Sequence, residues 1–251
     1  MAMGMFTGIP LPFHLWDEKL AAIMVASFPL IGLFIGGLWW FVGVLLMLPS
    51  FPVMIVAALL TVVPYWLAGF IHLDGYMDTS DAYLSWRPLD ERLRILKDPN
   101  VGAFAVVMMM ILLLLQFAAV YSVVDTGRFF GMVLAISIVS RACSSFCIFH
   151  LKHMPSSNYI PLLGEKLNNT HKIVVGLMST GAAVFGVLYA GVVGVLVVTA
   201  VIAGYTLAIH VVYKSFKGIS GDLLGYAMVI GEVCGLIALA LLQNTYLWVL
   251  Q

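Results

Sequence analysis

The chain has 251 residues, of which 63% are hydrophobic and only 10% are charged, and its mean hydropathy is +1.07. Charged residues make up about a quarter of an ordinary soluble domain, so this composition excludes that class. The formal net charge is zero, so the bulk charge gives no information about nucleic acid or acidic partners. We expect no nucleic-acid partner. Several apolar runs of roughly 20 residues or more predict an all-α, polytopic integral membrane helical bundle that forms one domain over residues 1–251.

Seven apolar segments follow one another along the chain. They cover residues 20–47, 52–71, 101–123, 129–150, 172–190, 191–213 and 223–249. Pro49 and Pro52 separate the first two, because proline interrupts a helix. The stretch from Gly191 to Gly194 is the expected turn between the fifth and the sixth. The N-terminal residues carry no basic region of a cleavable signal, so we expect the first span to stay in the protein.

The lysines and arginines predict how these spans are oriented in the membrane. With the N-terminus in the cytoplasm, ten of the twelve basic residues fall in cytoplasmic segments, Arg128 falls outside, and Arg141 lies within the fourth span. We therefore expect seven spans, an internal N-terminus and an external C-terminus. The polar stretches 72–100, 150–172 and 213–225 would then share the cytoplasmic side, where an enzyme meets soluble substrates.

The first of these stretches holds an acidic stripe. Asp74, Asp78 and Asp81 have the spacing i, i+4, i+7, which places them within about 60° on one helix face. Three carboxylates held so closely repel one another and need a cation nearby. Oxygen ligands of this kind suit Mg²⁺, which completes its coordination with waters and substrate phosphates. A solvated acidic face on a loop helix is the alternative.

Three further ionisable residues lie within or beside the later apolar segments. Asp222 begins the seventh span, and Glu232 follows ten residues later, about 15 Å deeper in a helix. Arg141 is a fixed cation inside the fourth span, suited to a phosphate or a carboxylate. Ionisable groups at membrane depth indicate function, but a purely structural Arg141–Glu232 pair is the alternative. His72 adjoins the acidic stripe and could contact metal or phosphate, or serve as a plain interfacial residue.

The stretch "HLDGYMDTSDA" at 72–82 resembles the signature of the cobalamin synthase family, the adenosylcobinamide-GDP ribazoletransferases. The resemblance extends to "FPLIGLFIGG" (28–37), "LKDPNVGAFA" (96–105), the Ser140–Arg141 pair and "SGDLLGYAMVIGE" (220–232). Met77 and Ala82 depart from the signature, and Val229 stands where the family commonly has another acid.

The resemblance implies a multi-pass enzyme of a bacterial or archaeal cytoplasmic membrane, with its active site on the cytoplasmic side. A hydroxyl of α-ribazole, or of its 5′-phosphate, would attack the GDP-activated corrinoid and release GMP, with Mg²⁺ as cofactor. The lipid bilayer and these small molecules would be its partners, and homo-oligomer formation is left open. The implied roles fall on nine residues: metal binding on Asp74, Asp78 and Asp81; catalysis on Asp222, Glu232 and Arg141; substrate binding on His72, Lys97, Asp98 and again Arg141.

Two other functions are compatible with parts of the pattern. A proton-coupled transporter could use Glu232 and Arg141 as a relay, but its polar groups should extend through the whole bilayer depth. A CDP-alcohol phosphotransferase also works at a membrane with clustered aspartates. However, the Ala-Arg that follows the first aspartates of that family is absent after Asp74 and Gly75.

Overall fold

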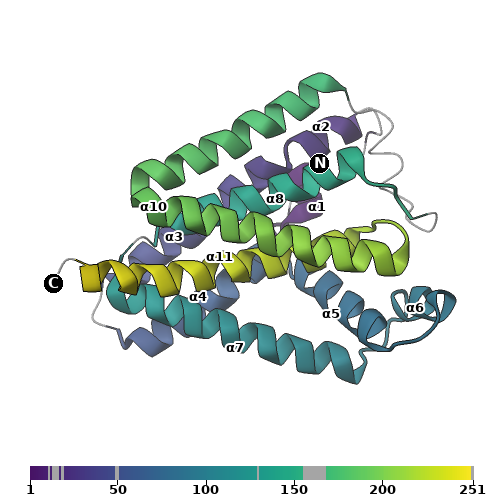
Figure 1. The fold of residues 1–251 in the computed structure, drawn as a ribbon, viewed down its shortest axis with the longest axis horizontal. Coiled ribbons are helices and arrows are strands. Elements are labelled where there is room, and N and C mark those ends of the chain that lie inside the picture. Colours follow the sequence, from purple (N-terminus) through teal and green to yellow (C-terminus); the bar gives the residue numbers. More distant parts are fainter. Residues whose placement is uncertain are drawn as a thin grey trace.

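The structure is a computed structural model that describes residues 1–10, 12, 17, 20–48, 51–128, 130–154 and 168–249, the last six of these by backbone only. The described residues form helices and no β-strand, which confirms the all-α helical bundle (Figure 1). The helices are α1 (Ala2–Phe6), α2 (Ala21–Ala26), α3 (Phe28–Met47), α4 (Val53–Leu67), α5 (Ile71–Leu84), α6 (Leu89–Ile95), α7 (Ala103–Thr126), α8 (Met132–His150), α10 (Asn169–Phe216) and α11 (Gly221–Val249).

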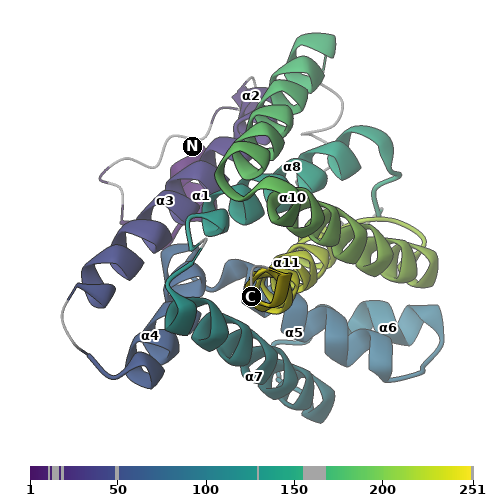
Figure 2. The same ribbon diagram turned by 60° about the vertical axis from the view of Figure 1, so that its left-hand side comes forward.

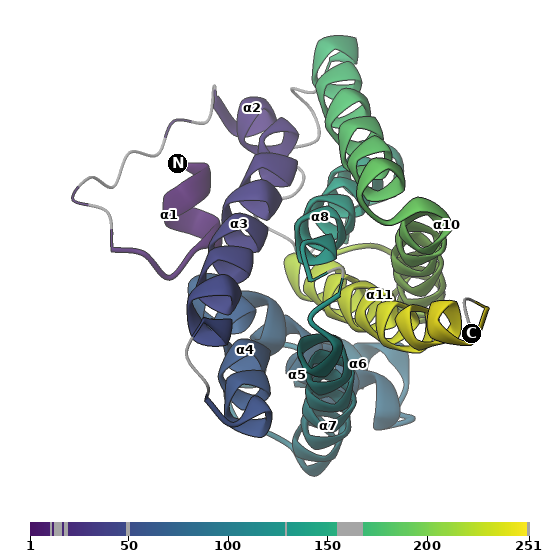
Figure 3. The same ribbon diagram turned by 90° about the vertical axis from the view of Figure 1, so that its left-hand side faces the viewer.

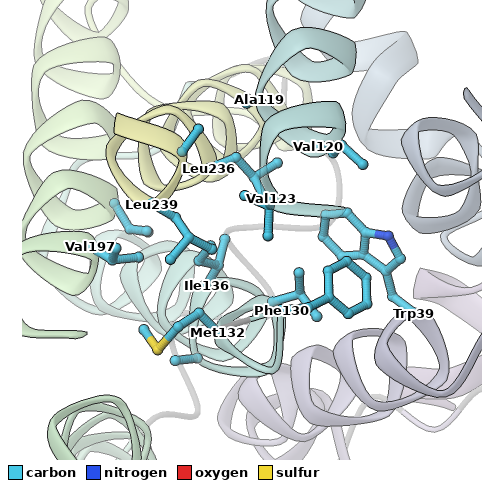
Figure 4. Close-up of a cluster of buried hydrophobic side chains, with 14 of the residues drawn as sticks. Trp39, Ala119, Val120, Val123, Phe130, Met132, Ile136, Val197, Leu236 and Leu239 are labelled. Atoms are coloured by element: carbon cyan, nitrogen blue, oxygen red, sulfur yellow. The ribbon is translucent and has the colours of Figure 1, made fainter. Parts of the chain in front are cut away.

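Helix α11 occupies the middle of the bundle. It packs against α5, α7, α8 and α10, and the view from one end shows these helices arranged around it (Figure 3). The largest cluster of buried side chains joins α3, α4, α7, α8, α10 and α11, with Trp39, Ile136 and Leu236 among its members (Figure 4). Large apolar side chains such as Leu114 and Leu188 remain exposed on the outside, as expected of helices that face lipid.

Helix α10 is bent back on itself at one glycine. Gly191 has φ 57° and ψ −132°, a non-helical conformation inside the 48-residue helix. A side chain at Gly194 would overlap the backbone of Gly186, so the two arms of α10 meet closely beside the break (Figure 2). The turn expected at Gly191–Gly194 is therefore confirmed. Glycine fits because it adopts positive φ without steric cost.

One segment that was expected to be continuous is broken, and a sharp bend precedes the acidic stripe. The apolar segment 20–47 forms two helices that meet at Ser27, where Pro29 in the first turn of α3 cannot supply a backbone donor. The acidic stripe does not directly continue the second span, because α4 and α5 are bent by 91°. Gly69 and Phe70, both with positive φ, form that bend.

The number of membrane spans is only partly settled by the helices. Five of the described helices, α3, α7, α8, α10 and α11, are long and apolar enough to cross a membrane, and the bent pair α4–α5 makes a sixth if it is taken as one span. Seven spans require that each arm of α10 also counts as one. The number seven and the cytoplasmic N-terminus stay predictions.

Reporter fusions test this topology. Fusions after Arg94, Ser157 and Lys217 should read cytoplasmic and one at Gln251 external, because basic residues stay on the cytoplasmic side; Ser157 and Gln251 lie outside the described residues. A fusion after Arg128 is the matched external control. A cytoplasmic signal at Gln251 would mean an even number of spans.

Candidate active site

The acidic stripe of α5 lies against the first turn of α11. A Cβ placed on Gly75 would lie 2.8 Å from the Cα of Asp222, so the two helix backbones touch at this point. Gly225 meets the backbone of His72 in the same way, 3.2 Å from its carbonyl oxygen. These two contacts run antiparallel along the helices and place Asp222 beside the stripe. The glycine within the "HLDGYMD" stretch is thus a packing residue.

Asp78 lies at the centre of the resulting group of four carboxylates, which we call the carboxylate cluster: Asp74, Asp78, Asp81 and Asp222. Burial of its own carboxyl group, followed by the negative charges of Asp74, Asp222 and Asp81, raises the pKa of Asp78 to about 6. Asp74 is exposed, while the other three are half-buried. Within the part of the chain that the structure describes, none of the four forms an ion pair.

The carboxylate cluster is suited to a metal ion that is coordinated partly by the protein and partly by substrate phosphates. Among the described residues, no three acidic, histidine or cysteine side chains are close enough to hold a metal ion by themselves. Mg²⁺ commonly takes only one or two carboxylates and fills its remaining positions with waters and phosphate oxygens. An open group of repelling carboxylates that forms no ion pair within the described ranges matches such a site and provides the negative charge that attracts the cation.

Asp81 also faces a second helix. A Cβ placed on Gly102, the residue before α7, would lie 2.0 and 2.1 Å from the two carboxylate oxygens of Asp81. The carboxylate therefore occupies the space that any side chain at position 102 would need. It lies at the N-terminus of α7, where backbone N–H groups favour a negative charge. Gly102 has φ −86°, which any residue can adopt. Glycine is therefore needed at this position for the space that it leaves to the Asp81 carboxylate, and not for its backbone conformation.

Gly102→Ala should reduce activity more than stability. The new methyl group would displace the movable carboxylate of Asp81, and a misplaced catalytic group can cost about 100-fold in rate. Gly75→Ala should instead lower the melting temperature, because its methyl group would meet the backbone of α11. Gly181→Ala, which meets nothing within 4 Å, is the control. Equal activity in the Gly102 and Gly181 variants would contradict the assignment.

Arg141 and Glu232 form a buried ion pair in the middle of the bundle. The Arg141 Nη1 to Glu232 Oε1 distance is 2.7 Å, and the two side chains are 2% and 10% exposed. Ser140 donates a hydrogen bond to the same carboxylate at 2.7 Å, and Arg141 donates one to the Ser137 carbonyl at 3.0 Å. Both residues therefore have structural partners, and Glu232 is committed to this pair rather than to the carboxylate cluster.

His72 lies near this pair and not with the aspartates. Its ring is 5.9 Å from the ring of Phe28, over which the Arg141 guanidinium carbon sits at 6.0 Å. Two residues apart on a helix, His72 and Asp74 project to nearly opposite sides. The His72 Nε2 and the Arg141 Nε are both buried without a hydrogen-bond partner among the described residues. Such atoms need an explanation, for example an ordered water or a ligand group.

Lys97 and Asp98 lie in the connection between α6 and α7. Lys97 is exposed. Asp98 accepts hydrogen bonds from the backbone and side-chain amides of Asn100, at 3.0 and 2.7 Å, and these bonds hold the pKa of Asp98 below its ordinary value. Asp98 thus shapes the loop that leads to Gly102, and its expected contact with substrate stays a prediction.

Fold and site together define a polytopic membrane protein with an acidic site at one end of its bundle, at α5 and the start of α11 (Figure 1). The chain belongs to the cobalamin-5-phosphate synthase family, whose model matches residues 1–240. This membership makes it an enzyme of cobalamin biosynthesis.

Curated relatives cover almost the whole chain. A protein of Clostridium perfringens named adenosylcobinamide-GDP ribazoletransferase is 34% identical over 259 residues, which cover 96% of each chain. Proteins with the same name from Clostridium botulinum and Lachnoclostridium phytofermentans are each 33% identical, covering 96% and 99% of this chain and 96% and 95% of their own. No solved structure matches the chain.

Proposed function

We propose that the protein joins adenosylcobinamide-GDP to α-ribazole, or to its 5′-phosphate, with release of GMP and with Mg²⁺ as cofactor. The observation that carries this proposal is the carboxylate cluster, which has no ion pair among the described residues and belongs to a chain of this family. Family membership favours the transferase over both the transporter and the CDP-alcohol phosphotransferase. The site would open to the cytoplasm, as the distribution of basic residues predicts.

The proposed reaction is a displacement at phosphorus. A ribose hydroxyl oxygen of α-ribazole forms a bond to the phosphorus on the corrinoid side of the diphosphate. The bond from that phosphorus to the oxygen of GMP breaks, and GMP keeps the electron pair. Asp222 is the proposed acceptor of the hydroxyl proton, because it is the member of the cluster that comes from a second helix and a general base must reach that proton.

Asp74, Asp78 and Asp81 would hold the metal together with waters and substrate phosphates, since no three such side chains among the described residues could hold it alone. When bound, Mg²⁺ neutralises charge on the diphosphate and aligns the reacting groups. Lys97 and Arg141 are proposed to bind the phosphates. For Arg141 this role requires substrate to reach a side chain that is 2% exposed, and it depends on the buried Nε that has no partner among the described residues.

The direct test is the reaction itself. Purified protein in neutral nanodiscs, incubated with adenosylcobinamide-GDP, α-ribazole and Mg²⁺, should release GMP and form the joined corrinoid in equal amounts. EDTA should stop both, and added Mg²⁺ should restore them, since diphosphate chemistry depends on charge neutralisation. A parallel reaction with α-ribazole 5′-phosphate identifies the preferred nucleoside. No GMP with either nucleoside would overturn the proposal.

A further inference from the structure

A second polar site lies beyond the end of α5. An open pocket of about 390 Å³ is lined by residues from the last turn of α5, from the connection between α5 and α6, from α6 and from the last turns of α10. Its polar and aromatic lining consists of Tyr83, Trp86, Arg87, Arg92, Lys214 and Ser215. Among the described residues, three cationic side chains and no acidic side chain line the pocket, which makes it attractive to an anion.

The cations are only weakly neutralised by the protein. The Arg92 guanidinium donates a hydrogen bond to the Ser215 hydroxyl and lies 5.3 Å from the centre of the Phe216 ring, so its head is held in place. Its Nε is buried and has no partner among the described residues. Arg87 meets Glu91 at 3.8 Å, with both side chains more than half exposed, and such surface pairs contribute little.

An exposed indole completes the pocket. Trp86 is 84% exposed, and its backbone has φ 54°, a left-handed conformation that is unusual and strained for a bulky residue. Its ring centre is 6.5 Å from that of Tyr83. Strain of this kind is typical of functional sites. An indole left in water beside three cations can pack on a flat or apolar part of an anionic ligand.

We propose that this pocket, which we call the α6 pocket, binds a phosphate group of an organic ligand. Arg87, Arg92 and Lys214 hold the phosphate oxygens, and Trp86 packs on the remainder of the ligand. Arginine and lysine are the usual partners of phosphate. None of the four carboxylates lines the α6 pocket among the described residues: Asp81 faces Gly102 before α7, whereas the pocket borders α10.

Two ligands share this chemistry. A nucleotide offers a phosphate and a ring that stacks on Trp86. An anionic phospholipid offers a phosphate at the membrane surface, where basic pockets between helices and exposed tryptophans are both common. The inference does not rest on the proposed transfer reaction, since binding is measured without Mg²⁺ and without a second substrate.

The test uses the whole protein in nanodiscs and two probes. The first probe is radiolabelled GMP, with the protein in neutral phosphatidylcholine. The second is the melting temperature in discs that contain phosphatidylglycerol, compared with neutral discs. The test variant is Arg87→Gln/Lys214→Gln, which leaves the buried contacts of Arg92 in place. The matched control, Arg94→Gln/Lys217→Gln, removes two charges outside the α6 pocket.

Saturable GMP binding that falls about tenfold or more in the test variant, and not in the control, would establish the site with a nucleotide as its ligand. Trp86→Leu should then weaken GMP binding by about fivefold or more. A thermal shift with phosphatidylglycerol that is lost in the test variant alone would establish the site with a lipid phosphate. The proposal is overturned if neither probe responds, or if both double variants respond alike.

Discussion

Replacing Asp78 by Asn should abolish turnover and, at the same time, raise the melting temperature of the metal-free protein. The carboxylate of Asp78 is half-buried and faces three others, which raises its pKa to about 6. Near neutral pH, keeping the Asp78 carboxyl ionised therefore costs free energy in the folded protein but not in the unfolded chain, and this lowers the free energy of unfolding. An amide removes that cost but is a weaker ligand for Mg²⁺ than a carboxylate. Activity and stability should change in opposite directions.

The expected loss of activity is large because Asp78 and Asp81 are proposed to bind the metal directly. Removing a residue that merely orients a metal ligand typically costs about 10- to 100-fold in metal affinity or activity, so loss of Asp78 or Asp81 itself should cost at least about 100-fold. Steady-state GMP release and thermal melting with and without Mg²⁺ measure the two effects. Mg²⁺ should stabilise the wild-type protein and fail to stabilise Asp78→Asn.

A matched control separates this site from general effects of charge. Asp90→Asn removes an equally negative but exposed side chain in the first turn of α6, and it should keep both activity and the stabilisation by Mg²⁺. Full activity in Asp78→Asn or Asp81→Asn would remove the metal assignment. A fall in the metal-free melting temperature of Asp78→Asn would show that the four carboxylates do not repel one another as the structure implies.

The features that could be predicted from sequence are those that depend on neighbours along the chain. The i, i+4, i+7 spacing of Asp74, Asp78 and Asp81 is a property of one helix, and α5 forms over that stretch. The break at Gly191 follows from glycine's access to positive φ. Long apolar runs predicted the membrane helices, because a spanning helix must satisfy its backbone within itself.

Other features depend on contacts between distant helices and could not be predicted in this way. The contact of Gly75 with Asp222, which brings the fourth carboxylate to the stripe, is visible only once α5 packs antiparallel on α11. The contact of Gly102 with Asp81 depends on where α7 begins. The 91° bend after α4 rests on Phe70, a residue type that rarely takes positive φ.

The pairing of Arg141 with Glu232 leads to the second large effect. Changing either residue alone, as Arg141→Met or Glu232→Gln, should lower stability by about 3–5 kcal/mol, because the partner charge is left buried and unpaired. The distance of 2.7 Å and the near-complete burial of both groups place them in the range where this cost applies. Arg128→Met, an exposed arginine outside the bundle core, is the control and should change melting little.

Stability alone does not show whether the pair also acts in the reaction, and the double variant Arg141→Met/Glu232→Gln does. Removing both charges should restore most of the melting temperature, since apolar replacements of a buried pair are often neutral. We expect activity per folded molecule to stay far below that of the wild type, because buried polar atoms without a partner need an explanation such as a ligand group. Here the Arg141 Nε and the His72 Nε2 lie buried around Phe28 and have no hydrogen-bond partner in the part of the chain that the structure describes. A stable and active double variant would show that the pair only supports the bundle, and the chemistry would then depend on the carboxylate cluster alone.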